Sequence, residues 1–365
     1  MRAQRSVGLV GLTWREAPTS LRAVAAAPLS DAEWGGLVAQ GARGLVEIHT
    51  CARSLWVIDA ADAAWTGALL QALVESRLEG AGAAVVPQAI AGDEAVRALL
   101  SIAIGLDSFV EGEADVGGQV LDGFAAAAEN GRGAADLAAL ARIVSRLGAE
   151  ARRSGVVRRG RGIGQLAAEN LPGLGVQRGA RVGVVGAGRI GTQVRASLQR
   201  AGFEPVVFNR TPREGARPLG EISGAGLRAL VACTSAPSAW LVAPEGLAVV
   251  DLGRPAQVNG AAVGLDAILH GPGLRLDAET RGRAQALVER AMGEWQAQWH
   301  AHVARERLAR VQQLRELFVE REIEATLGPA MEGLDGATRR RVLSAAKQAV
   351  RRYSHAVIGA LKEDR

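Results

Sequence analysis

The segment Gly186-Ala187-Gly188-Arg189-Ile190-Gly191 constrains the fold of this chain more than any other. An apolar run at 181–185 precedes it, a helix-like stretch at 190–200 follows, and a second apolar run comes at 205–208. A glycine-rich loop between a strand and a helix, within one βαβ unit, is typical of a Rossmann dinucleotide-binding domain. The first glycine permits a tight turn, the second lets the backbone approach a pyrophosphate, and the third lets the helix pack closely. The sequence therefore predicts a bound dinucleotide.

The residues after the second strand, Asn209-Arg210-Thr211, indicate which dinucleotide is bound. Proteins that use NAD usually carry Asp or Glu at this point, where the carboxylate binds the ribose 2′-hydroxyl. No carboxylate occurs here, and a guanidinium suits a 2′-phosphate. The pattern favours NADPH, with these predicted binding residues: Gly186, Gly188, Arg189, Ile190, Gly191, Asn209, Arg210 and Thr211.

The 365 residues exceed what one compact core usually holds, so more than one domain is expected. The N-terminal part mixes helix patterns with short strand patterns at 7–12, 45–49 and 55–58. We predict an α/β fold in three parts: a catalytic, substrate-binding α/β domain at 1–150, a Rossmann NADP-binding domain at 151–277, and a helical dimerisation domain at 278–365.

The last part of the chain shows a long helical period. Its apolar stripe runs through Ala284, Leu287, Val288, Ala291, Met292, Trp295, Trp299 and Val303, and continues at Leu308, Val311, Leu314 and Phe318. A stripe this long needs a partner helix, which a symmetric dimer supplies. Packing within one chain is the alternative.

Composition limits the cellular compartment and the kinds of partner that are expected. Two cysteines cannot form a disulfide framework, so a reducing cytoplasm is expected. No stretch reaches the roughly 18 apolar residues of a membrane helix, and no metal site is expected. The net charge of +5 fits an anionic partner such as tRNA, or an arginine-rich genome bias. Two interpretations also remain for the basic stretch at 152–162: it contacts RNA phosphate, or it is a solvated linker between domains.

Cys51 is the candidate nucleophile. It follows a short strand pattern, and Arg53 stands two residues later. A thiolate is the reactive form of cysteine, and a nearby cation lowers the pKa of a thiol. The alternative is a small buried side chain with no chemical role. Together with a dinucleotide, a reactive thiol indicates one chemistry: an acyl group is captured as a thioester and then reduced to an aldehyde.

Several further segments, in order along the chain, resemble the glutamyl-tRNA reductase family. They are Gly11-Leu12-Thr13-Trp14-Arg15-Glu16-Ala17-Pro18, Thr50-Cys51-Ala52-Arg53, Gly105-Leu106-Asp107-Ser108-Phe109-Val110-Glu111-Gly112-Glu113, Gly118-Gln119-Val120, Asn209-Arg210-Thr211, Thr234-Ser235-Ala236-Pro237 and Asp251-Leu252-Gly253-Arg254-Pro255. The resemblance spans nearly the whole length of the chain.

The resemblance implies a mechanism and an architecture. Cys51 would attack the ester that joins glutamate to tRNA, and NADPH would reduce the thioester to glutamate 1-semialdehyde, the first step of tetrapyrrole synthesis. The family is a V-shaped homodimer with a long spinal helix, and the aminomutase that consumes the aldehyde would be a further partner. The implied substrate-binding residues are Thr50, Arg53, Ser108, Glu113, Asp115 and Gln119.

The chain departs from the family pattern at five places around the implied site. The departing residues are Trp14, Ala52, Leu55, Ala98 and Asp115, where the family carries His, Asn, Glu, His and Gln. Two alternatives therefore stay open. One is a divergent reductase that uses another aminoacyl-tRNA or a carrier-bound thioester. The other is a non-catalytic homologue that binds tRNA or a haem-pathway partner.

Overall fold

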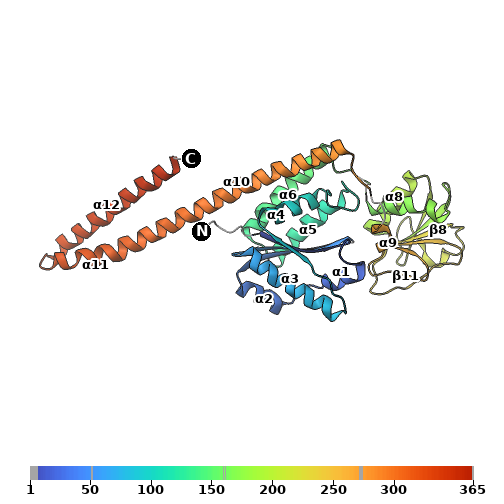
Figure 1. Cartoon of the computed structure of the whole chain (residues 1–365), viewed down its shortest axis with the longest axis horizontal. Helices are drawn as coiled ribbons and strands as arrows, with labels where there is room; N and C mark the ends of the chain where they lie inside the picture. The colour runs from blue at the N-terminus through green and yellow to red at the C-terminus, as the bar shows by residue number, and fades with distance from the viewer. Residues whose placement is uncertain (1–6, 51, 159, 161, 271–273, 364–365) are drawn as a thin grey trace. The chain divides into compact units, whose positions relative to one another are not determined.

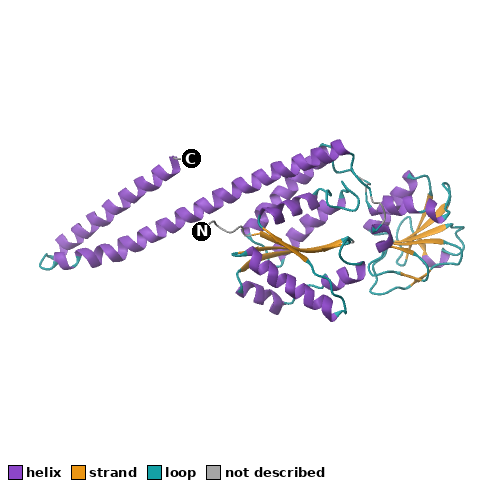
Figure 2. Ribbon diagram, in the orientation of Figure 1, coloured by secondary structure: helices purple, strands orange, loops and turns teal. Residues whose placement is uncertain are grey.

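The computed structural model describes residues 7–50, 52–158, 160, 162–270 and 274–363 (Figure 1). Cys51 therefore lies outside the described residues. The chain forms two compact units, Met1–Gly293 and Glu294–Arg365. The first unit holds two sheets with their helices, and the second is helical (Figure 2). This confirms the predicted α/β class with a helical C-terminal region; the division into three domains stays a prediction.

The first sheet has four antiparallel strands in the order β2-β3-β1-β4. The strands are β1 (Val7–Thr13), β2 (Ala42–His49), β3 (Arg53–Ala60) and β4 (Gln88–Ala91). The predicted strand pair around residue 51 is thus confirmed as β2 and β3. Thr13, the last residue of β1, pairs with Arg53, the first of β3. Two segments of the predicted site therefore start side by side at one edge of the sheet.

Helices cover both faces of this sheet (Figure 1). They are α1 (Thr19–Ala25), α2 (Asp31–Ala39), α3 (Ala63–Gly80), α4 (Asp93–Ala103), α5 (Asp115–Glu129) and α6 (Ala135–Arg153). Helix α2 begins with a capping box, in which the side chains of Ser30 and Glu33 each accept a hydrogen bond from the other residue's backbone N–H. Apolar residues of β1 and β3, such as Val10 and Trp56, pack with Leu70, Val74 and Leu78 of α3.

The second sheet has six parallel strands in the order β12-β10-β8-β5-β6-β7. Its strands are β5 (Arg181–Val185), β6 (Glu204–Asn209), β7 (Arg217–Pro218), β8 (Ala229–Ala232), β10 (Ala248–Asp251) and β12 (Val263–Gly264). Counted along the chain, this is the Rossmann order 3-2-1-4-5-6, read from the other edge. The order reverses between β5 and β8, and a ligand is expected outside the carboxyl ends of those two strands.

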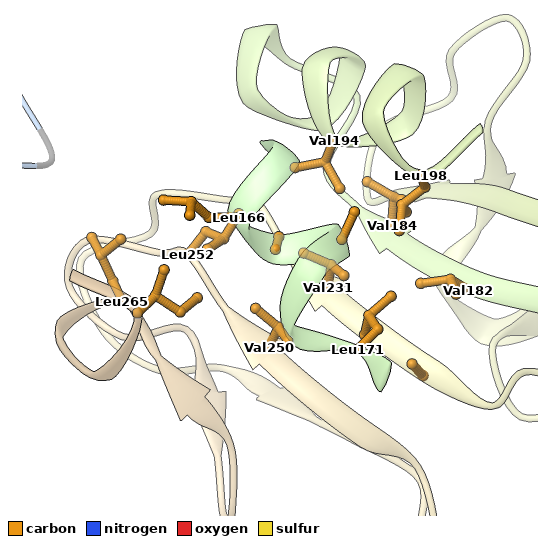
Figure 3. Packing of buried hydrophobic residues seen from close by; sticks show 14 of the residues in the cluster. Leu166, Leu171, Val182, Val184, Val194, Leu198, Val231, Val250, Leu252 and Leu265 are labelled. Atoms are coloured by element: carbon orange, nitrogen blue, oxygen red, sulfur yellow. The ribbon is translucent and has the colours of Figure 1, made fainter. Parts of the chain in front are cut away.

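Three helices belong to this second sheet: α7 (Ile163–Asn170), α8 (Arg189–Arg200) and α9 (Leu265–Leu269). β9 (Leu241–Val242) and β11 (Val258–Asn259) pair in parallel as a separate two-stranded sheet. Figure 3 shows how Leu166 of α7 and Val194 of α8 pack with strand residues such as Val184 and Val250. The core is built from Val, Leu and Ala, because aromatic residues make up only 4% of the chain.

Helix α10 (Ala278–Leu317) begins in the first compact unit and continues into the second. The second unit also contains a π-helical turn, Phe318–Glu322, and the helices α11 (Ile323–Leu327) and α12 (Gly336–Glu363). The predicted apolar stripe is confirmed as helical, but its burial changes along α10. Its first part is buried: Ala284, Leu287, Val288, Ala291, Met292 and Trp295. Val311 and Leu314 are 48% and 57% exposed, and Phe318, just beyond the end of α10, is 52% exposed.

Candidate active site

A crevice opens at the carboxyl ends of β5, β6 and β8, where the strand order predicts one. Its volume is about 310 Å³. The lining combines the glycine loop with the ends of β6 and β8: Val185, Gly186, Ala187, Gly188, Asn209, Arg210, Thr211, Cys233, Thr234, Ser235, Ala236 and Trp240. Neither Asp nor Glu is among these residues, which suits a cofactor with an extra phosphate rather than a free 2′-hydroxyl.

The three glycines of the loop meet three different spatial demands. Gly186 has a φ of +112°, and a Cβ there would lie 2.9 Å from the carbonyl oxygen of Cys233. A Cβ on Gly191 would lie 1.8 Å from the carbonyl oxygen of Gly186, so helix α8 cannot start this close to β5 with any other residue. A Cβ on Gly188 would meet open space. That open space is what a backbone approach by a pyrophosphate requires.

Within the Asn209-Arg210-Thr211 segment, Asn209 stabilises the glycine loop and Arg210 is exposed to solvent. The Asn209 side chain accepts a hydrogen bond from the Ala187 N–H at 3.2 Å and donates one to the Thr211 carbonyl at 2.8 Å. Arg210 is exposed at the rim of the crevice. Arg213, which the sequence analysis missed, donates to the Ala187 carbonyl at 2.8 Å. Of the remaining predicted residues, Arg189 is exposed at the start of α8 and Ile190 packs against the core.

A tight turn carries the predicted nucleophile segment between β2 and β3. The Thr50 hydroxyl oxygen accepts hydrogen bonds from the N–H groups of Ala52 and Arg53, at 3.2 and 3.1 Å. The Thr50 N–H donates to the Arg53 carbonyl at 2.8 Å. Thr50 is therefore a backbone brace of the turn that contains residue 51.

Arg53 is buried, with only 1% of its surface exposed. Its guanidinium donates to the Asp107 carbonyl and lies 3.5 Å from the Ser108 hydroxyl. The guanidinium also stands over the Trp14 ring, 5.6 Å from its centroid, within the range of a cation–π contact. Trp14 in turn packs edge-on against Phe109. The tryptophan that replaces the family's histidine thus covers the arginine of the nucleophile turn.

The loop between α4 and α5 brings the signature residues Ser108 and Glu113 to the same place. It depends on two glycines with left-handed backbones: a Cβ on Gly105 would lie 3.0 Å from the Glu113 nitrogen, and one on Gly112 would lie 2.5 Å from the Val156 carbonyl oxygen. The loop closes through a hydrogen bond from the Gly112 N–H to the Gly105 carbonyl. Gln119 lies further on in α5 and is half-buried.

Two carboxyl groups face the same small space at the start of α5. A Cβ on Gly162 would lie 3.9 Å from a Glu113 carboxyl oxygen and 3.8 Å from one of Asp115. Burial raises the pKa of Glu113 to about 7; Arg53 opposes the rise, Asp115 adds to it, and a hydrogen bond with Ser108 opposes it. Asp115 also accepts a hydrogen bond from Gln193 of α8 at 2.7 Å. Asp115 and Gln193 line a cavity of about 370 Å³. Their hydrogen bond links the signature loop to helix α8, which begins at the glycine fingerprint.

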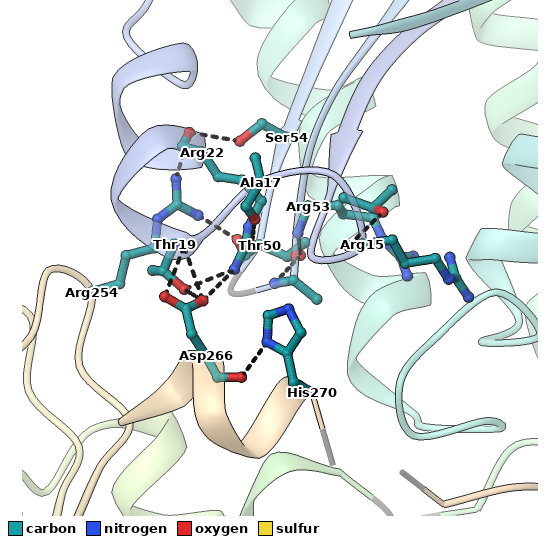
Figure 4. A network of polar contacts seen from close by, with 12 residues as sticks. Arg15, Ala17, Thr19, Arg22, Thr50, Arg53, Ser54, Arg254, Asp266 and His270 are labelled. Atoms are coloured by element: carbon teal, nitrogen blue, oxygen red, sulfur yellow. Dashed lines mark hydrogen bonds and ion pairs between the residues drawn. The ribbon is translucent and has the colours of Figure 1, made fainter. Parts of the chain in front are cut away.

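A second link, which the sequence analysis did not assign, comes from Arg254, three residues after β10. Its guanidinium donates to the carbonyl of Thr50 and, at 3.2 Å, to the carbonyl of Arg22 (Figure 4). Its signal in the sequence was the family-like segment at 251–255. Asp251, at the end of β10, shapes the Arg254 loop by accepting from the N–H groups of Gly253, Gln257 and Val258.

A third link joins α9 to the N-terminus of α1. Asp266 accepts from the Thr19 N–H at 2.9 Å and from its hydroxyl at 2.5 Å, and lies 3.7 Å from the buried guanidinium of Arg22. The carbonyl of Asp266 also bonds His270 Nδ1 at 2.7 Å, as Figure 4 shows. Three links therefore hold the nucleotide crevice and the nucleophile turn within one compact unit.

Two other side chains near the site, those of His49 and Cys233, are held in their neutral forms. Burial, followed by the charges of Arg254 and Arg77, lowers the pKa of His49 to about 4, so its ring is neutral near pH 7. Burial also raises the pKa of the Cys233 thiol, which keeps it protonated. Among the residues that the structure describes, no group of three His, Cys, Asp or Glu side chains could hold a metal ion.

The fold and the site define a class: a two-sheet α/β protein with a Rossmann crevice joined to a turn that carries a cysteine. Comparison with known proteins is more specific. The sequence model described as "Glutamyl-tRNAGlu reductase, N-terminal domain" matches residues 10–154. The chain is 33% identical to glutamyl-tRNA reductase 2 of Nocardioides over an alignment of 302 positions, and 29% identical to glutamyl-tRNA reductase of Myxococcus xanthus over an alignment of 394 positions.

Coverage differs between these relatives. The Nocardioides match takes in 72% of this chain and spans 60% of that relative's length; the Myxococcus match takes in 95% and spans 87%. A solved glutamyl-tRNA reductase from Methanopyrus kandleri aligns over 99% of this chain and 100% of its own, with 22% identity and a TM-score of 0.48. The chain belongs to the glutamyl-tRNA reductase family.

Proposed function

We propose that this protein reduces glutamyl-tRNA to glutamate 1-semialdehyde with NADPH, through a thioester on Cys51, at the start of tetrapyrrole synthesis in the cytoplasm. One observation carries the proposal. Arg254 belongs to the loop after β10 of the Rossmann sheet, yet it donates to the carbonyl of Thr50, the residue before Cys51. The turn that carries the thiol is therefore tied to the sheet that carries the nucleotide crevice.

The first step is acyl transfer. The Cys51 thiolate attacks the ester carbonyl, the bond to the ribose oxygen of the tRNA breaks, and that oxygen takes a proton as it leaves. Thr50, Arg53 and Arg254 hold the backbone of the turn through the hydrogen bonds described above. Glu113, with its pKa of about 7, is suited to hold or give up a proton near neutral pH.

The second step is a two-electron reduction of the thioester, which yields the aldehyde and returns the thiolate. Bound NADPH supplies the hydride. The crevice suits this cofactor because Gly188 leaves room for a pyrophosphate and Arg210 stands exposed at the rim without a neighbouring carboxylate. The backbone N–H groups at the start of α8 suit the negative charge of the pyrophosphate.

A second candidate keeps this chemistry and changes the amino acid. Arg53 is buried and engaged by Asp107, Ser108 and Trp14, which leaves its guanidinium poorly placed for a substrate carboxylate. Asp115 adds a negative charge where the family carries Gln. These observations favour an aminoacyl group without a side-chain carboxylate, or a carrier-bound thioester.

The test is NADPH oxidation with a panel of charged tRNAs, beside mass spectrometry of the protein. Without NADPH, the wild-type protein should accumulate an acyl adduct on Cys51. Cys51→Ser should lose reduction, because a hydroxyl is a poorer nucleophile than a thiol and its ester accepts hydride less readily. Activity of Cys51→Ser, or an adduct on another residue, would contradict the thioester. Turnover of another charged tRNA alone would select the second candidate.

Asp115→Gln, which restores the family's residue, sharpens that choice. It should raise activity on glutamyl-tRNA by removing a negative charge, and competing charged tRNAs should lose ground in the same assay. Asp122→Asn, on the exposed side of α5, is the matched control. The implied partners, a second copy of the chain and the aminomutase that takes the aldehyde, belong to this proposal.

A further inference from the structure

The Rossmann sheet has a second cavity at the edge opposite the nucleotide crevice. It has a volume of about 610 Å³ and lies where the chain enters β5, β8 and β10. The five residues of β5 rise about 3.3 Å each, so this cavity lies roughly 16 Å from the glycine loop. A cofactor pyrophosphate on that loop cannot also occupy this edge.

Three arginines line the cavity: Arg178, Arg181 and Arg228. The lining contains no carboxylate. Arg181 is 3.4 Å from Glu204, but both side chains are more than half exposed, and an exposed pair of this kind stabilises a protein little. Arg178 and Arg228 have no ion pair within the described part of the chain. The cavity therefore has a surplus of positive charge that the fold does not use.

The rest of the lining favours an extended anion over a compact one. Gly226 and Gly246 form turns with left-handed backbones, at φ values of +63° and +79°, and a Cβ on either would meet open space. Exposed arginines around open backbone turns can follow successive phosphates, whereas a small organic ligand needs apolar cover. The volume also exceeds what one phosphate fills.

We propose that this edge, formed by Arg178, Arg181 and Arg228, binds the phosphate backbone of RNA. Naming that RNA as the tRNA of the substrate rests on the proposed function; the phosphate chemistry does not. The arginines give affinity and orientation without reading base sequence, because phosphate contacts carry no sequence information directly.

The test compares two charge-matched double variants of the full chain. R178Q/R228Q removes two lining arginines, and R142Q/R195Q removes two exposed arginines of α6 and α8. Binding of fluorescein-labelled, uncharged tRNA is measured from 50 to 300 mM KCl. R178Q/R228Q should weaken binding about ten-fold or more at 100 mM, and the slope of log K against log salt should flatten by about 1.5. The control should move either quantity far less.

Two outcomes would overturn the proposal. Equal effects in the two variants would mean that only net charge matters. Loss of inorganic phosphate binding with tRNA binding intact would make the cavity a small-anion site. NADPH binding, measured by fluorescence, confirms folding, and the single variants R178Q and R228Q serve if the double variant fails to fold. A wild-type protein that binds tRNA through this edge but reduces no charged tRNA would refute the proposed function and leave this surface standing.

Discussion

Replacing Glu113 by Gln should stabilise the protein at high pH and leave its stability nearly unchanged at low pH. Burial raises the pKa of this carboxyl to about 7 against an ordinary value of 4.5. A carboxyl that binds its proton more tightly in the folded chain stabilises the fold only while it is protonated. That stability is present below pH 4.5 and is lost as the pH rises to about 7.

The size of the effect follows from the same two values. One pKa unit corresponds to about 1.4 kcal/mol, so a gap from 4.5 to about 7 costs the folded state about 3 kcal/mol above pH 7. Glutamine is neutral in both states and has no such cost. Because Glu113 is only partly shielded from solvent, 3 kcal/mol is an upper bound, and we expect about 2 kcal/mol at pH 8.

The assay is urea denaturation at pH 4.5, 6 and 8, followed by tryptophan fluorescence, with the exposed Glu129→Gln at the end of helix α5 as control. The midpoint of Glu113→Gln should rise relative to wild type between pH 4.5 and 8, and the control difference should stay flat. A difference for Glu113→Gln that is the same at all three pH values would refute the reasoning, because it would show that its carboxyl titrates alike in the folded and unfolded chain.

Three further predictions concern the cofactor, the turn and the assembly. Arg210→Ala should weaken NADPH binding about ten- to a hundred-fold with little change for NADH, by loss of a charge-assisted contact; equal loss for both, by fluorescence titration, would show that Arg210 does not read the 2′-phosphate. Arg254→Met removes the donors to the Thr50 and Arg22 carbonyls and should lower kcat at least ten-fold while the KM for NADPH stays unchanged; a rise in that KM alone would place Arg254 in the cofactor site. Light scattering should find the full chain dimeric and residues 1–293 monomeric, since Val311, Leu314 and Phe318 are exposed on the helix; a full-length monomer at micromolar concentration would exclude the dimer.

The sequence predicted the strands and the helix around the nucleotide crevice well because their signal is local. The glycine spacing, the flanking apolar runs and the Asn209 segment lie within about thirty residues, and β5, α8 and β6 match the predicted ranges to within a residue or two. Local pattern did not show that Asn209 braces the loop while Arg210 faces solvent. That distinction depends on which side chain points back toward Ala187.

The other half of the site depends on distant contacts that no local pattern encodes. Arg254 and Thr50 are 204 residues apart in the chain, and Asp266 and Thr19 are 247 apart. The substrate-binding role of Arg53 stays a prediction, but its burial beneath Trp14 and its bond to the Asp107 carbonyl could not be read from the sequence. The identity of residue 14 gave no sign of this, because a tryptophan in a loop is as well suited to a surface as to a lid over a guanidinium.

Two of the five departures from the family pattern, Trp14 and Asp115, change the surroundings of Arg53 and Glu113. Trp14 stands where the family pattern has a histidine and covers Arg53, and its backbone N–H donates to the Ala52 carbonyl at 2.9 Å. Asp115 replaces a neutral amide and raises the pKa of Glu113, while Gln193 of α8 binds the new carboxylate. The site therefore has less free positive charge and a more basic carboxyl than the family pattern implies. A pocket of this kind favours a proton donor near neutral pH and disfavours a second substrate carboxylate. Activity that falls as the pH rises through 7, and that recovers with Asp115→Gln, would tie both properties to the same pair of acids.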